Sequence, residues 1–421
     1  MVGLFLYRVG ILGYGMLVRL VSFWHIKARL WVRGRKNWYQ RIAARFSPQN
    51  AKVIWFHCAS LGEFEQGRAV MERFKQLHPD WKLVITFYSP SGYEVRKNYA
   101  VADLVSYLPL DTPRNARKFI TLIQPTVAVF VKYEFWYYYL HELSKRHIPS
   151  YLISAIFRRE QAFFRRGYGA LYRKWLLLFT GLMVQDQPSA NLLAEYGIVQ
   201  GVQVVGDSRF DRVWQAASQP VKPLEKVEAF CANAPVFVAG STWAADEEYL
   251  RPVIDAMPQE WKCIVVPHEI HEANILDWLS RYASTAVRYT AESTPEELQH
   301  ARVLLVDQVG ILLSIYRYAS LAYVGGGFGV GIHNTIEPAA CGLPVCFGPN
   351  FAAFREAREL ITQGAALSLH SAEDFMRELL ALMQNKHKRE AMGHTAKEYV
   401  AANIGASGRI IATIEHAQLN Q

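Results

Sequence analysis

The sequence predicts an α/β protein with two Rossmann-like domains that face a common cleft, preceded by a membrane-associating helix. Three observations support this. From about residue 50, short β-branched and aromatic runs alternate with helical stretches, a pattern typical of a parallel sheet covered by helices. The alternation lapses at residues 211–225, where two prolines fall, and then resumes. Residues 4–24 are mostly apolar and about long enough to cross a bilayer.

The first half of the chain holds seven candidate strands, and helices fit between them. Two of these helices are expected at Glu63–Leu77 and Pro113–Ile123. The expected strands are Val53–His57, Leu83–Tyr88, Val105–Leu108, Val127–Val131, Ser150–Ser154, Leu182–Val184 and Val202–Val205.

The second half repeats the pattern with six candidate strands and helical stretches near 310–319, 371–384 and 387–403. These strands are Val236–Ala239, Cys263–Val266, Val303–Val306, Leu321–Val324, Val345–Phe347 and Ala366–Leu369. We therefore divide the chain into a basic, apolar segment, a first domain, a linker, a second domain and a C-terminal helix. Their bounds are 1–48, 49–212, 213–225, 226–400 and 401–421.

The formal net charge of +9 arises at the N-terminus. Nine of the 46 Lys and Arg residues lie in residues 1–50 with no Asp or Glu, which leaves 37 basic against 37 acidic residues elsewhere. Basic residues and Trp24, Trp31 and Trp38 follow the apolar run, as expected at an anionic membrane surface with the later domains in the cytoplasm. A membrane span and a helix lying in the interface both fit. Nucleic acid would suit the charges, but would leave the apolar run without a purpose.

A glycine-rich run follows the apolar stretch Leu321–Val324. Gly325–Gly327 would let the backbone approach a ligand closely. Asn334 and Thr335 can cap a helix beginning near Glu337, and free amides at such a start attract phosphate, while Glu337 could accept hydrogen bonds from ribose. The run therefore suits a nucleotide-activated sugar; the alternative is a glycine-rich turn before a buried helix start.

The run Ser60–Glu63 directly follows the first strand. Ser60 can cap the next helix with Glu63 at its third position, which is a capping box. Alternatively, Glu63 lies at the carboxyl end of a strand as a general base, since transfer to a hydroxyl needs a carboxylate within hydrogen-bonding reach.

Two further charged residues lie near expected strand ends. Glu134 follows the fourth strand and would face the same cleft, or would be a solvated residue at a helix start. Arg209 lies where the first domain closes, and could offset charge on a departing phosphate or pair with Asp211.

Gly240-Ser241-Thr242 offers hydroxyls and amides after the first strand of the second half, and the following Asp246-Glu247-Glu248 resembles ordinary acidic residues of a first helical turn. His268 follows Pro267 at the next strand end and suits a contact to a nucleotide base or phosphate. We expect no metal there, because His268 and His271 are three apart in a loop. The five cysteines form no C-x-x-C pair and indicate buried thiols in a reducing compartment.

Two arginine pairs, at 158–159 and 165–166, alternate with three phenylalanines at 157, 163 and 164. Such a basic and aromatic patch suits RNA or an acidic lipid. The apolar N-terminus favours lipid.

Taken in order, these motifs resemble the Kdo (3-deoxy-D-manno-oct-2-ulosonic acid) transferases, which have the GT-B fold. The resemblance runs to about residue 360. Glu63 matches a proton acceptor in S-x-G-E, Glu134 matches the Glu of E-x-W, and Arg209 stands where the family has Lys. Three departures are the Arg at position 209, Ile311 in place of a Glu, and a missing Arg beside Pro267. The resemblance implies a CMP site at Ser241, Thr242, Pro267, His268, Val309, Gly310, Ile311, Gly326, Gly327, Asn334, Thr335, Ile336 and Glu337.

The implied reaction is inverting transfer of Kdo from CMP-Kdo to a lipid A precursor, lipid IVA, in lipopolysaccharide biosynthesis. Residues 49–212 would bind the acceptor and residues 226–400 the CMP-sugar. The resemblance implies no cofactor or metal, no nucleic-acid partner, contact with membrane phospholipid through the N-terminal segment, and a place on the cytoplasmic face of the inner membrane. Two alternatives are another GT-B enzyme that uses a UDP-sugar, such as a lipid glycosyltransferase or an epimerase, and a non-catalytic membrane-bound module that binds nucleotide or lipid.

Overall fold

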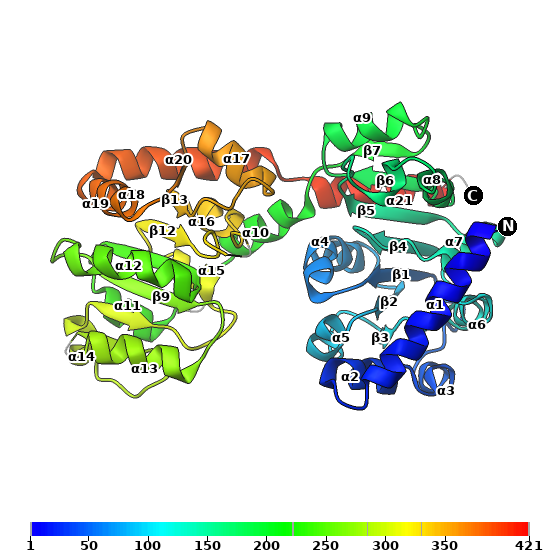
Figure 1. Cartoon of the computed structure of the whole chain (residues 1–421), viewed down its shortest axis with the longest axis horizontal. Coiled ribbons are helices and arrows are strands. Elements are labelled where there is room, and N and C mark those ends of the chain that lie inside the picture. Colours follow the sequence, from blue (N-terminus) through cyan, green and yellow to red (C-terminus); the bar gives the residue numbers. More distant parts are fainter. Residues whose placement is uncertain (1, 221–222, 284, 330, 420–421) are drawn as a thin grey trace. The chain divides into compact units, whose positions relative to one another are not determined.

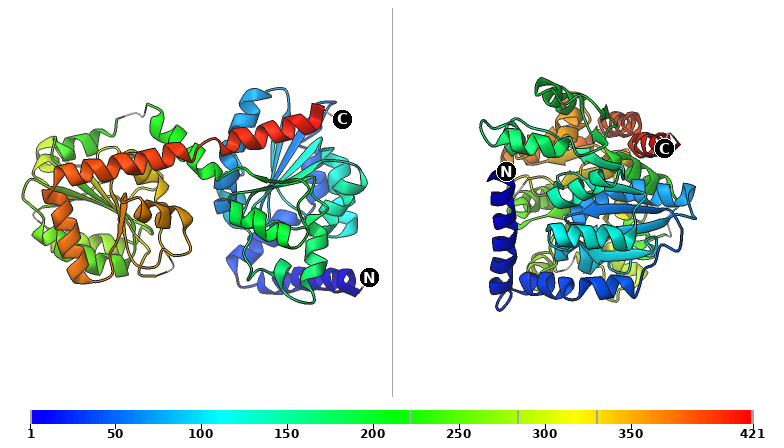
Figure 2. Two further views of the ribbon diagram at one scale, coloured as in Figure 1. Left: turned by 90° about the horizontal axis from the view of Figure 1, so that it is seen from above. Right: turned by 90° about the vertical axis from the view of Figure 1, so that its right-hand side faces the viewer.

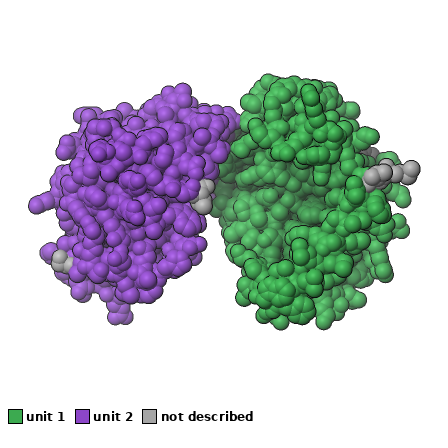
Figure 3. All heavy atoms as spheres, viewed as in Figure 1, with its two compact units in different colours: residues 1–212, 404–421 green, residues 213–403 purple. Residues whose placement is uncertain are grey.

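The computed structural model describes residues 2–220, 223–283, 285–329 and 331–419 (Figure 1). The chain forms two compact units, residues 1–212 with 404–421 and residues 213–403, which Figure 3 colours separately. Each unit contains a seven-stranded parallel sheet with helices on its faces. The prediction of an α/β protein with two Rossmann-like parts and an apolar N-terminal helix is confirmed.

The sheet of unit 1 has the strand order β3-β2-β1-β4-β5-β6-β7, and every pair of neighbours is parallel. Its strands are β1 (Val53–Cys58), β2 (Lys82–Phe87), β3 (Leu104–Tyr107), β4 (Val127–Val131), β5 (Ser150–Ala155), β6 (Gly181–Val184) and β7 (Val202–Val204). The strand order reverses between β1 and β4. In open α/β sheets, ligands bind outside the carboxyl ends of the strands at such a reversal.

Helices cover both faces of this sheet, so the strands are apolar on both sides. Trp55 and Phe56, neighbours on β1, belong to two different core clusters on opposite faces. Local signals fix the helix ends: the Thr112 side chain caps α6 at Asn115 N, with Pro113 in its first turn. The helices are α4 (Leu61–Leu77), α5 (Pro90–Arg96), α6 (Pro113–Ile123), α7 (Tyr137–Lys145), the 3₁₀ helix η1 (Ala162–Phe164), α8 (Gly169–Leu176) and α9 (Gln187–Glu195).

The N-terminal segment belongs to unit 1 and comprises α1 (Val2–Val21), α2 (Ile26–Arg35) and α3 (Trp38–Ala43). One side of α1 packs on the unit, with Gly3 against Leu171 and Gly15 against Leu110. Its other side is apolar and exposed; Phe5, Leu6, Val9, Leu12, Met16, Leu17 and Leu20 expose 43–66% of their surface. By length and composition, residues Gly3–Val21 could cross a membrane.

Two of the N-terminal residues expected at a membrane surface, Trp31 and Arg35, instead pack into unit 1. The Arg35 guanidinium donates to Tyr88 O and Leu108 O, both at 2.8 Å, and lies 3.9 Å from the centre of the Trp31 ring. Burial lowers the pKa of Arg35 to about 10. Trp31 is also buried, whereas Trp24 is 73% exposed. Some basic and aromatic residues of this segment therefore pack on unit 1, and others face solvent.

The C-terminal helix α21 (Ala406–Leu419) packs on unit 1 beside α4 (Figure 2). It buries Ile410, Ile411 and Ile414 in the same core cluster as Phe56 of β1. Asp211 caps this helix, because its carboxylate accepts hydrogen bonds from Gly405 N at 2.7 Å and Ser407 N at 3.2 Å. The fold of unit 1 thus needs both ends of the chain.

The sheet of unit 2 has the order β10-β11-β9-β8-β12-β13-β14, also fully parallel, and reverses between β8 and β12. Its strands are β8 (Val236–Thr242), β9 (Lys262–Pro267), β10 (Ala286–Arg288), β11 (Val303–Leu305), β12 (Leu321–Val324), β13 (Val345–Phe347) and β14 (Ala366–Ser368). The sequence did not predict β10, which is three residues long and only half-buried, so its hydrophobic pattern is weak.

The helices of unit 2 cover both faces of its sheet. They are α11 (Glu225–Cys231), α12 (Ala244–Ala256), α13 (Glu272–Arg281), α14 (Pro295–His300), α15 (Leu312–Tyr316), α16 (Ile336–Ala340), α17 (Arg355–Thr362), α18 (Ala372–Asp374), the π-helix η2 (Phe375–Leu379), α19 (Leu380–Gln384) and α20 (Lys386–Ala402). The segment expected as a linker is helical up to Ser218, because α10 (Ser208–Ser218) runs across the boundary of the units with Phe210 and Val213 buried.

Candidate functional site

Glu63 lies at the carboxyl end of β1, in the first turn of α4. Its carboxylate accepts hydrogen bonds from the N–H groups of Ala59 and of the N-cap residue Ser60, whereas the Ser60 side chain makes no capping bond, so the capping-box interpretation is only half fulfilled. Burial and then the charge of Glu134 raise the pKa of Glu63 to about 7, against the opposing effects of the Ala59 and Ser60 amides and Lys132. A carboxylate with this pKa is suited to accept a proton near neutral pH.

Glu134 follows β4, the neighbour of β1, and is buried rather than solvated. Its Oε2 atom lies 2.9 Å from His57 Nε2 and accepts a hydrogen bond from Trp136 Nε1 at 2.5 Å. The structure therefore brings Glu63 and Glu134 to the point where the strand order of unit 1 reverses, and the charge of one acts on the other.

His57 is a site residue that the sequence reasoning missed. It is fully buried on β1, and its Nδ1 atom lies 2.9 Å from Thr86 Oγ1, which also accepts a hydrogen bond from Trp55 Nε1 at 2.8 Å. Its Nδ1 atom also lies 3.2 Å from Thr86 O, and its Nε2 atom lies 2.9 Å from Trp136 Nε1. The available signal was a histidine inside an otherwise apolar strand.

Basic groups complete the site in unit 1. Arg209 pairs with Asp207 at 2.7 Å, not with Asp211, which caps α21. Lys132, between β4 and Glu134, was not predicted and has a left-handed backbone with φ 71°, which costs energy for a residue other than glycine. Burial and then the charge of Arg209 lower the pKa of Lys132, while Glu63 opposes the change, so these charged groups lie close enough to interact.

In unit 2, the predicted glycine loop follows β12 beside the end of β8. A Cβ atom on Gly325 would lie 2.3 Å from Ser241 O, and one on Gly327 would lie 2.5 Å from Gly348 Cα. Gly326 has φ +94°. These three positions therefore require glycine for packing and conformation as well as for any ligand.

Asp246 anchors this loop, contrary to the prediction that it is an ordinary residue of a first turn. It is fully buried, and its carboxylate accepts hydrogen bonds from Gly326 N at 2.8 Å, Trp243 N at 2.9 Å and Tyr323 Oη at 2.8 Å. Glu247 is also buried and accepts from Trp278 Nε1 at 2.8 Å. Only spatial neighbours could have shown this role, because acidic residues are common in first turns.

The short helix α16 begins at Ile336. Asn334 Oδ1 accepts a hydrogen bond from Ile336 N at 3.1 Å, and Asn334 Nδ2 donates to Glu337 Oε1 at 3.0 Å. Thr335 makes no side-chain cap, and Thr335 and Ile336 are fully buried. These two residues therefore lie beneath the surface of the site, whereas Asn334 and Glu337 are half-buried.

Three rings stack at the carboxyl ends of β8, β9 and the glycine loop. The centre of the His268 ring lies 4.1 Å from that of the His333 ring and 4.7 Å from that of the Trp243 ring. Trp243 Nε1 donates a hydrogen bond to His333 Nε2 at 2.8 Å. Burial and then His268 lower the pKa of His333 to about 4, so this ring is neutral near pH 7. The His268 side chain is exposed and offers a face on which a planar ring can stack.

The remaining predicted residues of unit 2 differ in how exposed they are to solvent. Thr242 is buried with its hydroxyl bonded to Glu247 at 3.3 Å, Pro267 is buried, and Ser241 is half-buried with φ 54°. Val309 is 79% exposed in the turn before α15.

Residues Gly310 (φ 88°) and Ile311 complete that turn. The helix that follows is close to β8, since a Cβ atom on Gly240 would lie 3.0 Å from Leu312 Cδ1 and 2.2 Å from Tyr316 Oη. The charge of Glu337 acts on Tyr316, so the ends of β8, α15 and α16 converge.

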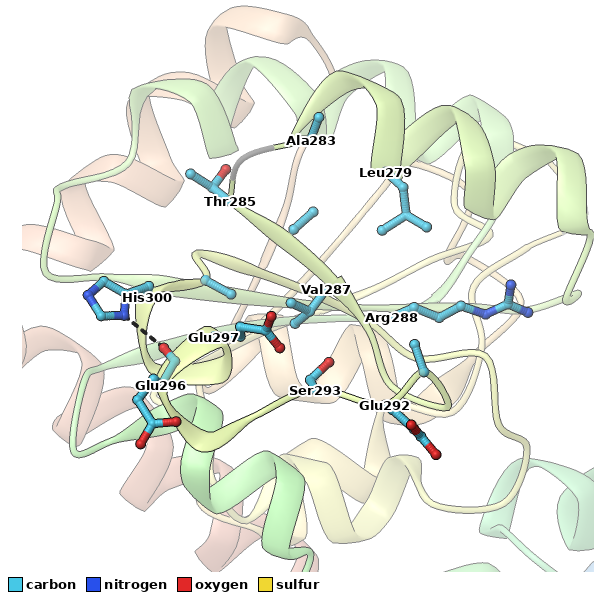
Figure 4. Close-up of a pocket in the computed structure, with 13 residues that line it drawn as sticks. Leu279, Ala283, Thr285, Val287, Arg288, Glu292, Ser293, Glu296, Glu297 and His300 are labelled. Carbon is cyan, nitrogen blue, oxygen red and sulfur yellow. Dashed lines mark hydrogen bonds between the residues drawn. The ribbon is translucent and has the colours of Figure 1, made fainter.

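A spacious pocket lies elsewhere, along the outer strand β10 of unit 2 (Figure 4). Its volume is about 650 Å³, and α13, β10 and α14 line it with Leu279, Val287, Glu297 and His300 among others. It contains none of the predicted site residues. The described residues also show no cluster of three His, Cys, Asp or Glu able to hold a metal ion.

A family profile described as 3-deoxy-D-manno-octulosonic-acid transferase (Kdo transferase) matches residues 36–212. Relatives named 3-deoxy-D-manno-octulosonic acid transferase extend this similarity to most of the chain. The Haemophilus influenzae protein is 25% identical over 88% of this chain and 90% of its own length. The Bordetella pertussis protein is 24% identical over 92% and 94%. Residues 36–212 thus match the Kdo transferase family, and these relatives extend the likeness to most of the chain.

Solved structures show the fold of this chain to be GT-B. UDP-N-acetylglucosamine 2-epimerase from Neisseria meningitidis superposes with a TM-score of 0.60 at 14% identity, covering 87% of this chain and 100% of the epimerase. MurG from Acinetobacter baumannii gives 0.55 at 12%, covering 87% and 99%. At these identities the likeness concerns the fold alone.

Proposed function

We propose that this protein is a Kdo transferase that moves Kdo from CMP-Kdo to a hydroxyl of a lipid A precursor, lipid IVA, with inversion at the anomeric carbon. The supporting observation is the pair Glu63 and Glu134 at the strand reversal of unit 1, with the pKa of Glu63 raised to about 7. Glu63 takes the acceptor's proton as the hydroxyl oxygen bonds to the anomeric carbon. The bond from that carbon to the phosphate oxygen breaks, and CMP leaves with the electron pair.

The other charged groups of unit 1 serve charge separation in this reaction. Glu134, fixed by His57 and Trp136, stabilises positive charge that develops on the sugar ring. The positive charges of Arg209 and Lys132 offset the negative charges of the donor's phosphate and of the sugar carboxylate. Asp207 holds the Arg209 side chain, which is a positioning role.

Unit 2 supplies the CMP site in this proposal. The backbone of Gly326 and Gly327 approaches the phosphate, Glu337 accepts from ribose hydroxyls, and the exposed His268 ring stacks on the base. Contacts from Ser241, Asn334, and the turn Val309–Ile311 complete it; Thr242, Pro267, Thr335 and Ile336 are buried and contribute to its shape. In this proposal, the transfer needs no bound metal ion or cofactor.

We further propose that α1 lies in the cytoplasmic surface of the inner membrane. A helix packed lengthwise on unit 1 with one apolar side exposed fits an interfacial position better than a span. A basic cavity of about 390 Å³, lined by Arg19, Arg33 and Lys36 beside Trp31 and Trp38, suits a phospholipid headgroup.

The direct test is mass spectrometry of the product formed from CMP-Kdo and lipid IVA. Addition of Kdo is expected; turnover of a UDP-sugar alone would refute the donor assignment. The Glu63→Ala variant should lose transfer by at least about 10²-fold while CMP binding, measured by calorimetry, is retained. Unchanged turnover in this variant would remove Glu63 from its role.

A further inference from the structure

An aromatic cavity lies on unit 1 next to the candidate catalytic carboxylates. Its volume is about 300 Å³, at the lower end of the range for small-molecule pockets. Four segments form its walls: α1, the loop after β4, η1 and α8. The residues that line it are Tyr7, Ile11, Tyr133, Phe135, Trp136, Ala162, Phe163, Tyr172 and Trp175. None of them carries a charge at neutral pH.

The aromatic cavity is linked to Glu134 through Trp136. Trp136 lines the cavity, and its Nε1 atom donates the 2.5 Å hydrogen bond to Glu134 Oε2. Tyr133 and Phe135 flank Glu134 in the chain and line the same space. A molecule that fills the cavity is therefore separated by Trp136 from the carboxylate that we place at the reaction centre.

The opposite wall of the aromatic cavity is the apolar helix α1. Tyr7 and Ile11 face the cavity, while Leu6 and Val9, on the same turns, are 61% and 51% exposed. The Tyr7 hydroxyl is held by Asp111 Oδ2 at 2.5 Å, and its ring packs edge-on against Trp175 at 4.9 Å. The helix that we place in the membrane surface thus forms one side of the cavity.

Charge and hydrogen bonding near the cavity indicate a particular kind of apolar ligand. Arg8, Arg165, Arg166 and Lys174 are exposed and are close in sequence to lining residues, which suits a phosphorylated headgroup outside the cavity. Trp175 is only 3% exposed, and its indole N–H has no hydrogen-bond partner among the described residues. That nitrogen is itself buried, so the walls present mainly aromatic carbon to a ligand.

We propose that the aromatic cavity binds one acyl chain of the lipid acceptor and thereby selects acylated acceptors. The inference rests on the proposed function, because the acceptor is the lipid that reacts beside Glu134. A sugar or a nucleobase would leave its polar groups facing aromatic walls without partners, which is costly, whereas a methylene chain loses nothing there. Binding the chain would hold the acceptor's hydroxyl group near the two carboxylates.

The test fills the cavity and measures acceptor selectivity. In Ala162→Trp, a large ring replaces the methyl group of Ala162, which lines the cavity on η1. The ratio of kcat/KM for the acylated acceptor to that for the same acceptor after removal of its acyl chains should fall by about tenfold or more, the loss expected when roughly two methylenes are no longer buried. Ala170→Trp, at an exposed position of α8 outside the cavity, is the matched control and should keep the ratio.

A second variant protects the test against misfolding. Ile11→Ala widens the cavity from the α1 side and should lower the same ratio to a smaller extent. An unchanged ratio in both folded variants would overturn the inference while leaving the proposed function intact. Failure of the unaltered protein to transfer Kdo to either acceptor would instead refute the proposed function.

A binding experiment tests the cavity without turnover. An acceptor with a diazirine on one acyl chain should crosslink to residues of η1, α8 or α1, and unlabelled acceptor should compete, while excess phosphatidylglycerol should not. Crosslinks confined to other segments would overturn the inference. Equal competition by phosphatidylglycerol would also overturn it, because the cavity would then bind bulk lipid.

Discussion

At the scale of single residues, Glu63 combines the two requirements of a general base. It lies at the strand reversal of unit 1, and its environment raises its pKa from 4.5 to about 7. Burial disfavours the charged form, and Glu134 adds repulsion. Lys132 and two backbone amides limit the rise, so the group still ionises near neutral pH. The site thus holds a reactive carboxylate at the expense of stability.

Two pH dependences follow for Glu63. The transfer rate should rise as pH increases through about 7, because the ionised form accepts the proton. Stability should change in the opposite direction: the folded state keeps its proton between pH 4.5 and 7 while the unfolded state loses it, so the free energy of unfolding falls across that window and is level above it.

Urea denaturation of Glu63→Gln checks the stability effect. The variant carries no charge and should be more stable than the unaltered protein by roughly 2 kcal/mol at pH 8, with little difference below pH 4.5. A constant difference across this pH range would show that the pKa of Glu63 is not raised.

At the scale of elements, the glycine loop after β12 depends on α12 as much as on its own glycines. Asp246 connects the first turn of α12 to Gly326 and to Tyr323 of β12 through its two carboxylate oxygens. The loop conformation is therefore fixed before any ligand binds, which reduces the entropy lost on binding.

Removing the Asp246 anchor should weaken nucleotide binding. Asp246→Ala leaves three donors without their acceptor, and each such loss costs about 1–3 kcal/mol. We expect a lower melting temperature and at least roughly tenfold weaker CMP binding by calorimetry. Asp246→Asn, which keeps one acceptor oxygen, should have a milder effect, and Glu248→Gln, at an exposed position of the same helix, should have none. Equal CMP affinity in all three variants would refute the anchoring role.

The sequence predicted the strands better than it predicted the roles of individual side chains. Apolar runs identified thirteen of the fourteen strands in the described residues, because strands buried on both faces carry a strong local signal, and the half-buried β10 does not. The glycine loop and Glu134 could be placed from their position after strands. His57, Lys132 and Asp246 could not, because their roles come from partners distant in sequence, such as Glu134 for His57 and Tyr323 for Asp246.

At the scale of the whole molecule, the chain builds unit 1 from both of its ends. Residues 404–421 return to unit 1 after unit 2 is complete, and α21 buries three isoleucines beside α4. α4 also carries Glu63. The helix that holds the candidate base is therefore supported by the last helix of the chain.

Loss of α21 packing should destabilise unit 1 selectively. The double variant Ile410→Ala/Ile414→Ala removes two fully buried side chains and should lower the free energy of unfolding by about 4 kcal/mol or more. Ala412→Ser, on the exposed side of the same helix, should change it little. Hydrogen exchange should show the faster exchange in β1 and α4 rather than in β8 and β12. Equal acceleration in both units would contradict this assignment.

This return of α21 has a consequence during translation. While the ribosome is still producing residues 213–403, the apolar surface of α4 and β1 that α21 later covers is open to water. Unit 2 can reach its native structure first, although its residues are synthesised second. A nascent chain stalled before residue 404 should therefore bind chaperones through its N-terminal half, and release should coincide with emergence of the final helix from the exit tunnel.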